Sequence, residues 1–208
     1  MALAKLIGLD ESTSFLIAIL AISVAVGIDY VVTGNYITFF IIIVAVLIAF
    51  LPHELAHRNM ARRLGCYSRY VIDPLGLFIT LLSGFLAFIG IGFIRIIIPG
   101  YVLISSPRYD PLFNKRIEGL TAIVGPLVNI VISIALTMLY ISAGLYLFEL
   151  SPLLYFFIYW TASINAWLAL FNLIPIPPLD GSKILSWKPI TWIIMFASAV
   201  ILFYLSIF

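Results

Sequence analysis

The sequence predicts an all-α polytopic membrane protein with five to six transmembrane helices and a re-entrant or β-hairpin segment around residues 70–105. Three observations support this fold class. Charged residues make up only 10% of the 208 residues and apolar residues 64%, whereas an average soluble domain is about one quarter charged. The mean hydropathy is +1.21. Several apolar stretches also approach the roughly 20 helical residues that cross a bilayer core.

Five segments have about the length of a membrane span. They cover residues 15–32, 36–57, 119–147, 153–174 and 189–207. The first is longer than the apolar core of a typical cleaved signal peptide, so we expect it to be retained. No stretch between the segments is polar enough to fold outside lipid, so residues 1–208 are expected to form a single membrane-embedded domain.

The segment at 70–105 is apolar but has to begin and end on the same side of the membrane. A re-entrant hairpin, or a helix followed by strands, satisfies both conditions. Residues 93–98 and 101–105 are predicted to form a β-hairpin around the turn at Pro99-Gly100. Non-helical backbone at membrane depth must be buried in protein or line a watery cavity, so this segment is the candidate wall of a substrate groove. The alternative is an ordinary pair of helices with glycines at their packing contacts.

Basic residues predict the orientation in the membrane. Alternating crossings place on one side Lys5, Arg58, Arg62, Arg63, Arg69, Arg108, Lys115, Arg116, Lys183 and Lys188. The positive-inside rule makes that side cytoplasmic. We therefore expect a multi-pass protein of the cell membrane.

Composition also limits the partners of the chain. Its net charge of +2 is too small to indicate a nucleic-acid partner, and its single cysteine, Cys66, excludes an internal disulfide. The expected surroundings are the lipid bilayer. The oligomeric state has no interpretable signal in the sequence.

The two histidines of the chain stand four residues apart, in His53-Glu54-Leu55-Ala56-His57. Four residues are slightly more than one helical turn, so both imidazoles project from one helix face and can converge on one zinc ion. Glu54 is placed to act on a water at that ion. Buried histidines often bond only to backbone groups, but polar groups are costly at membrane depth, which disfavours an idle pair.

A catalytic zinc usually has three protein ligands, so a third is needed. Most acidic residues lie before the first span, on the far face, or in connections. Asp180 instead follows the span at 153–174, at about the depth of the histidines, after three prolines in four positions. Prolines cannot continue a helix, so we expect a rigid, extended segment that aims Asp180 inward. The alternative is an aspartate that caps a turn before Gly181.

Two asparagines of the predicted spans are candidate site residues. The NH₂ group of Asn172 is a candidate to hold the carbonyl oxygen of a scissile peptide as negative charge develops there, although a hydrogen bond between helices is equally compatible with the sequence. Gly125-Pro126 is expected to kink its span and to let another helix approach closely. Packing is the favoured interpretation of that region, with Asn129 a weak candidate for the site.

These motifs together resemble the site-2 protease family of intramembrane zinc metalloproteases, in its archaeal and bacterial branch. The resemblance rests on two motifs: the histidine motif at the end of one span, and Asn172 with Pro-Leu-Asp180-Gly181 at the end of a later span. It covers about residues 36–185. It implies that His53, His57 and Asp180 are zinc ligands, that Glu54 is the catalytic base, and that Asn172 stabilises the transition state. Larger members carry an inserted PDZ domain, for which this chain has no room.

The expected function is zinc-dependent hydrolysis of peptide bonds in transmembrane protein substrates, within or near the bilayer, as in regulated intramembrane proteolysis. One Zn²⁺ per chain is expected, in a catalytic core at about 36–185 with accessory spans at 15–32 and 189–207. A substrate helix must unwind locally and is expected to dock as an added strand near residues 96–104.

Two other functions are compatible with the same motifs. A non-catalytic zinc-binding membrane protein or a metal transporter would use the same ligands, but transport favours polar residues through the whole depth of the bilayer, and here they gather near one face. A peptidase that acts on soluble or lipid-modified substrates shares the histidine motif but accounts less well for the segment from Asn172 to Asp180.

Overall fold

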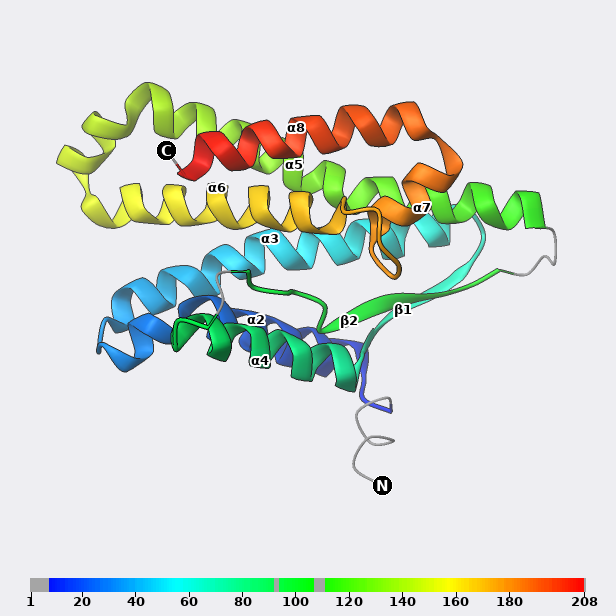
Figure 1. The fold of residues 1–208 in the computed structure, drawn as a ribbon, viewed down its shortest axis with the longest axis horizontal. Coiled ribbons are helices and arrows are strands. Elements are labelled where there is room, and N and C mark those ends of the chain that lie inside the picture. The colour runs from blue at the N-terminus through cyan, green and yellow to red at the C-terminus, as the bar shows by residue number, and fades with distance from the viewer. Residues whose placement is uncertain (1–7, 92–93, 107–110, 208) are drawn as a thin grey trace.

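The computed structural model describes residues 8–91, 94–106 and 111–207 (Figure 1). Within these ranges the chain forms seven helices and two strands, in the order α2 (Glu11–Val32), α3 (Tyr36–Arg63), β1 (Tyr67–Ile72), α4 (Pro74–Phe88), β2 (Gly100–Ser105), α5 (Pro111–Leu150), α6 (Pro152–Asn172), α7 (Asp180–Trp187) and α8 (Pro189–Ile207). Helices α2, α3, α5, α6 and α8 are long and apolar enough to cross a membrane. The predicted fold class is confirmed, and these five helices overlap the five predicted segments.

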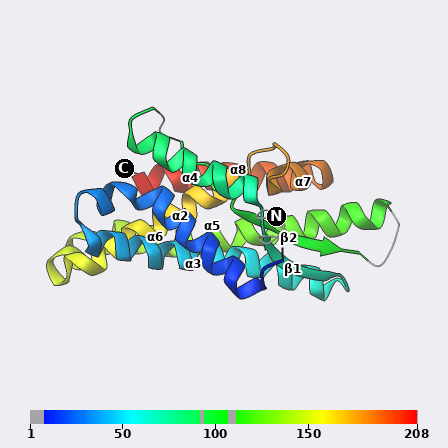
Figure 2. The same ribbon diagram turned by 90° about the horizontal axis from the view of Figure 1, so that it is seen from below.

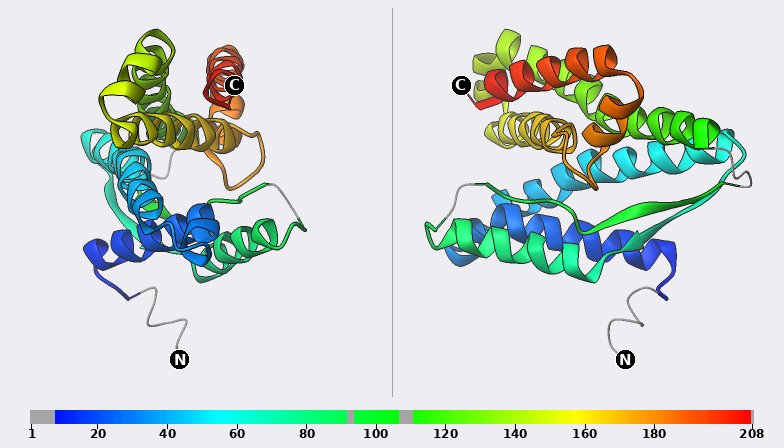
Figure 3. Two further views of the ribbon diagram at one scale, coloured as in Figure 1. Left: turned by 90° about the vertical axis from the view of Figure 1, so that its left-hand side faces the viewer. Right: turned by 45° about the vertical axis from the view of Figure 1, so that its right-hand side comes forward.

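Helix α3 is the centre of the fold. It packs against α2 on one side and against α5 and α6 on the other. Figure 1 and the left view of Figure 3 show α2 and α4 as one layer and α5, α6 and α8 as a second, with α3 between them. The fully buried Ile42 and Val46 anchor α3 in the core. The histidine motif continues the same helix, so the site lies between the two layers.

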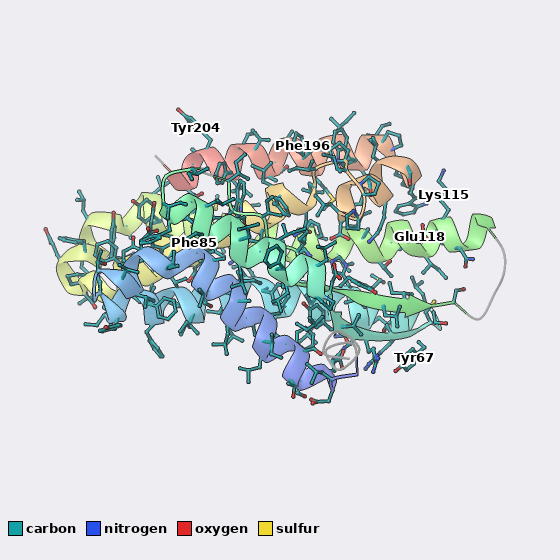
Figure 4. All side chains as sticks on the ribbon, turned by 60° about the horizontal axis from the view of Figure 1, so that its bottom comes forward. Tyr67, Phe85, Lys115, Glu118, Phe196 and Tyr204 are labelled. Carbon is teal, nitrogen blue, oxygen red and sulfur yellow. The ribbon has the colours of Figure 1, made fainter. Side chains whose placement is uncertain are left out.

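The outer surface is apolar along the spanning helices and charged at one end. Phe85 of α4 and Tyr204 of α8 are 49% and 60% exposed. Figure 4 shows Tyr204 projecting from the bundle, whereas Lys115 and Glu118 lie on the start of α5, at the end that also holds Tyr67 of β1. Exposed apolar side chains of this size suit a helix surface that faces lipid.

The two strands form a small antiparallel sheet at that end of the molecule (Figure 2). Helix α3 ends at Arg63, and Gly65 adopts φ +81°, which residues with a side chain rarely adopt. The chain then turns into β1, which pairs with β2 from Tyr67↔Ser105 to Ile72↔Gly100. The sheet is thereby held beside the end of α3.

The predicted β-hairpin between 93–98 and 101–105 is wrong. Residue 93 lies outside the described residues, and 94–98 form no strand. The partner of β2 is β1, and α4 is inserted between them. Helix α4 starts directly after β1 because the carboxylate of Asp73 accepts a hydrogen bond from Gly76 N at 3.0 Å, with Pro74 at the first helical position.

The irregular chain at 94–99 is held by side chains in place of a neighbouring strand. Ser83 Oγ accepts a hydrogen bond from Ile96 N at 2.9 Å, and Thr80 Oγ1 accepts one from Ile98 N at 3.1 Å. Trp167 of α6 donates its indole N–H to Arg95 O at 3.2 Å. These bonds satisfy the non-helical backbone inside the protein, as the membrane environment requires.

Candidate metal centre

Three potential metal ligands meet between the two layers. The Nε2 atoms of His53 and His57 lie 2.9 Å apart, and Asp180 Oδ2 lies 3.5 Å from the first and 3.0 Å from the second. All three side chains are buried. The histidines come from successive turns of α3 and Asp180 from the first residue of α7, so the structure brings together the three residues that the sequence singled out.

The segment between α6 and α7 brings Asp180 to this point. Residues 173–179 form a series of bends and turns, so the expected extended conformation is wrong, although the carboxylate does point inward. Gly181 lies against the end of α6, where an added Cβ would come within 2.6 Å of Ile174 O. A glycine is needed here because any side chain would collide with the backbone of Leu173 and Ile174 where α7 starts beside α6.

Hydrogen bonds fix the direction of both imidazoles. His53 Nδ1 lies 2.5 Å from Asn129 Oδ1, and His57 Nδ1 lies 2.6 Å from Thr121 O. Carbonyl oxygens only accept hydrogen bonds, so both imidazoles donate from Nδ1 and keep their lone pairs on Nε2. The two lone pairs and the carboxylate of Asp180 therefore face one point.

This donor set fits a zinc ion. Two imidazole nitrogens and one carboxylate oxygen are an established set of protein ligands for catalytic zinc. Three electron-rich atoms packed this closely repel one another unless positive charge lies between them. The carboxylate of Asp180 faces both Nε2 atoms and supplies the negative charge that a bound cation would balance.

A cavity of about 370 Å³ opens onto these ligands. Glu54 and Asn172 both line it, together with Gly100, Tyr101 and Val102 of β2. Glu54 is buried, and Asn172 donates a hydrogen bond from Nδ2 to Leu168 O at 3.0 Å, which leaves its second N–H for another acceptor. The cavity thus places a carboxylate, an amide and the edge of a strand beside the three ligands.

Helix α5 closes the opposite side of the site. A Cβ at Gly125 would overlap the His57 imidazole and lie 2.8 Å from His53 Nε2. The expected close approach of another helix at Gly125-Pro126 is therefore observed, and the helix that approaches is α3 with its histidines.

Comparisons with known proteins agree with this arrangement. A sequence model described as "Peptidase family M50" matches residues 149–188, which include Asn172 and Asp180. The chain is 35% identical over 161 residues to "Putative zinc metalloprotease MJ0611" of Methanocaldococcus jannaschii, an alignment that covers 77% of each protein. The chain belongs to peptidase family M50, the site-2 protease family. It is also 28% identical over 160 residues to "Putative zinc metalloprotease YwhC" of Bacillus subtilis, covering 69% of this chain and 67% of that protein. No solved structure matches the chain.

Membership in the M50 family confirms the resemblance that the motifs indicated. Together with its five apolar helices, it makes this M50 peptidase an integral membrane protein. The residues that sequence reasoning missed or ranked low are those that orient the histidines, namely Thr121 and Asn129. The available signal was the presence of asparagines in apolar spans, where unpaired amides are costly. The sequence did not show which ligand they support.

Proposed function

We propose that this M50 peptidase is a zinc-dependent endopeptidase that cleaves transmembrane protein substrates within or near the bilayer, as in regulated intramembrane proteolysis. The observation that carries the proposal is the meeting of His53, His57 and Asp180 in one buried cluster, with Glu54 in the same cavity. Two histidines and one aspartate as metal ligands, with a further carboxylate beside them, are typical of zinc hydrolases.

One Zn²⁺ per chain would be held by Nε2 of His53, Nε2 of His57 and the carboxylate of Asp180. When bound, the ion supplies a Lewis acid that polarises the scissile carbonyl and makes a water acidic. Thr121 O and Asn129 Oδ1 keep the two imidazoles in the tautomer that can bind the ion.

Glu54 is the proposed general base and acid. It follows His53 on α3 and lines the cavity, so its carboxylate can take the proton of the attacking water and then give a proton to the leaving amine. Asn172 is the proposed stabiliser of the transition state, because its second amide N–H can point at the oxygen on which negative charge develops.

The substrate is proposed to dock as an extended strand on β2. The outer edge of β1 is already occupied: Arg62 donates to Ser68 O at 2.8 Å, and Glu11 accepts from Tyr70 N at 2.9 Å. The other edge of the sheet belongs to β2 and borders the cavity. An unwound substrate segment can pair there, which presents its scissile carbonyl to the ligands.

The active site is proposed to face the cytoplasm. Lys183 lines the cavity, with its ammonium group 3.6 Å from Asp180 Oδ1, and Arg62 and Arg63 end α3 just beyond the histidines. Basic residues at this end of the molecule favour the cytoplasmic side by the positive-inside rule. Water, a reagent of hydrolysis, then reaches the ligands from that end.

The decisive experiment measures zinc content and cleavage of a model transmembrane peptide by the purified protein in detergent. Glu54→Gln should lower the cleavage rate by about 10²- to 10⁴-fold while zinc remains bound, because the amide keeps the shape of the side chain but cannot accept the proton. Glu118→Gln, which changes an exposed glutamate on α5, is the matched control. Normal cleavage by Glu54→Gln would refute the assigned base, and a wild-type protein that binds zinc without cleaving would indicate a binding or transport role.

A further inference from the structure

A chain of buried amides links α6 to the metal ligand His53. Asn165 Nδ2 donates to Thr161 O at 2.8 Å, and Asn129 Nδ2 donates to Asn165 Oδ1 at 2.9 Å. Asn129 Nδ2 also donates to Ala49 O at 2.8 Å, and its Oδ1 lies 2.5 Å from His53 Nδ1. Both asparagines are 0% exposed. Three helices thus contribute to one hydrogen-bonded path that ends on a potential zinc ligand.

Backbone carbonyls set the direction of every bond in this path. Thr161 O can only accept, so the NH₂ group of Asn165 faces it and the oxygen of Asn165 faces Asn129. Asn129 must then donate one hydrogen to Asn165 and the other to Ala49 O. Its remaining polar atom, Oδ1, faces His53 and can only accept. The imidazole therefore donates from Nδ1, and its Nε2 lone pair is directed to the cavity.

We propose that Asn165 is a positioning residue that acts through Asn129 to hold His53 in the orientation and tautomer that bind the metal. The inference rests on the proposed function, since it concerns the same ligand. Asn165 does not line the cavity and has no described contact with His53, so its influence has to pass through the amide of Asn129.

Asn165 is needed because Ala49 O alone engages only one of the two N–H bonds of Asn129. Without Asn165 the second N–H would be buried and unpaired, and the amide could rotate to find another partner. Rotation would move Oδ1 away from His53 Nδ1 and weaken the bond that fixes the imidazole. Partners of this kind, one step behind a metal ligand, typically change metal affinity when they are removed.

The test measures zinc affinity of the full-length protein in detergent, by competition with a chelator. Asn129→Leu should raise the zinc dissociation constant by about 10- to 100-fold, and Asn165→Leu by about 3- to 10-fold, since Ala49 O still holds Asn129 in the second variant. The double variant should bind zinc no more weakly than Asn129→Leu, because a residue that acts only through Asn129 loses its effect when Asn129 is gone.

Ser133→Ala is the matched control. Ser133 Oγ donates to Ala162 O at 3.2 Å across the same contact of α5 with α6, one turn from Asn129, and it is equally buried. Its removal should leave zinc affinity unchanged. Thermal unfolding identifies variants that fail to fold, and Asn165→Ala replaces Asn165→Leu if leucine is not accommodated.

Cobalt substitution gives a readout that a merely structural role would not move. The d–d absorption of bound Co²⁺ depends on the geometry of its ligands, so Asn165→Leu should shift it and Ser133→Ala should not. The role of Asn165 would be refuted if Asn165→Leu left both the zinc affinity and the Co²⁺ spectrum unchanged. It would also be refuted if the losses of zinc affinity in the two single variants added up in the double variant. Neither result would contradict the proposed function. A wild-type protein that binds no zinc would overturn the proposed function and this inference together.

Discussion

His57 Nε2 and Asp180 Oδ2 lie 3.0 Å apart, although the first belongs to the end of a membrane-spanning helix and the second to the start of a short helix much later in the chain. A catalytic zinc usually needs three protein ligands, so neither helix supplies a complete set by itself. Their contact depends on the bends at 173–179 and on the packing of α7 against α5.

Asp180→Ala should abolish stoichiometric zinc binding. Two imidazoles remain, but the only carboxylate described within the cluster is lost. We therefore expect zinc affinity to fall by more than ~100-fold, which exceeds the usual effect of removing a residue that only hydrogen-bonds to a ligand. Metal content of the purified protein is the measurement. Asp73→Asn is the control, since Asp73 lines the same cavity without joining the cluster. Full zinc occupancy in Asp180→Ala would remove it from the ligand set.

Gly125→Ala should disrupt the site through a single added methyl group. The new Cβ would lie 2.8 Å from His53 Nε2 and would overlap the His57 ring, so either α5 or the imidazoles must move. Overpacking of this kind typically costs about 1–3 kcal/mol of folding free energy, and displaced imidazoles should also bind zinc more weakly. Thermal unfolding and zinc affinity measure the two effects.

The control for this change lies on the same helix. At Gly144 the nearest atom to an added Cβ is Tyr155 Cε2, at 3.6 Å, an ordinary contact. Gly144→Ala should leave zinc affinity unchanged and stabilise the helix by up to about 1 kcal/mol, because alanine favours helix more than glycine does. Equal behaviour of the two variants would show that Gly125 has no special relation to the histidines.

Val102→Pro should impair substrate docking without loss of zinc. Tyr70 N donates to Glu11 and not to the opposing strand, so the Tyr70–Val102 pair is a non-hydrogen-bonded pair and Val102 N–H points to the free edge of β2. Proline removes that donor while the bonds between β1 and β2 stay intact.

One lost backbone hydrogen bond corresponds to about 1 kcal/mol, so we expect kcat/KM for a transmembrane substrate to fall by about 5-fold or more. Val102→Ala trims the side chain but keeps the N–H, and it should retain most of the activity. If Val102→Ala were as impaired as Val102→Pro, the side chain and not strand pairing would hold the substrate.

The spanning helices and the histidine motif were predictable because both depend on local patterns. A run of apolar residues predicts a membrane helix wherever it lies, and four-residue spacing places His53 and His57 on one face of any helix. The same reasoning identified Asp180, Glu54 and Asn172, all of which border one cavity or its ligand cluster.

The pairing of β2 was not predictable in the same way. Residues 93–98 and 67–72 are both apolar segments next to turn residues, and strand propensity alone does not decide between them. The choice depends on α4, which starts at Pro74 and carries Thr80 and Ser83 as partners for the irregular backbone at 94–98. Those hydrogen bonds exist only once α4 is folded against that segment.

The sequence by itself determined that the chain crosses a membrane and that two imidazoles share one helix face beside Glu54, because composition and helical period act over a few neighbouring residues. Only the tertiary structure decided that Asp180 reaches the histidines, that Asn129 and Thr121 O fix their tautomers, and that β2 lies beside the cavity. Such contacts join residues far apart in the chain, so they depend on how whole helices pack and on which buried polar groups find partners.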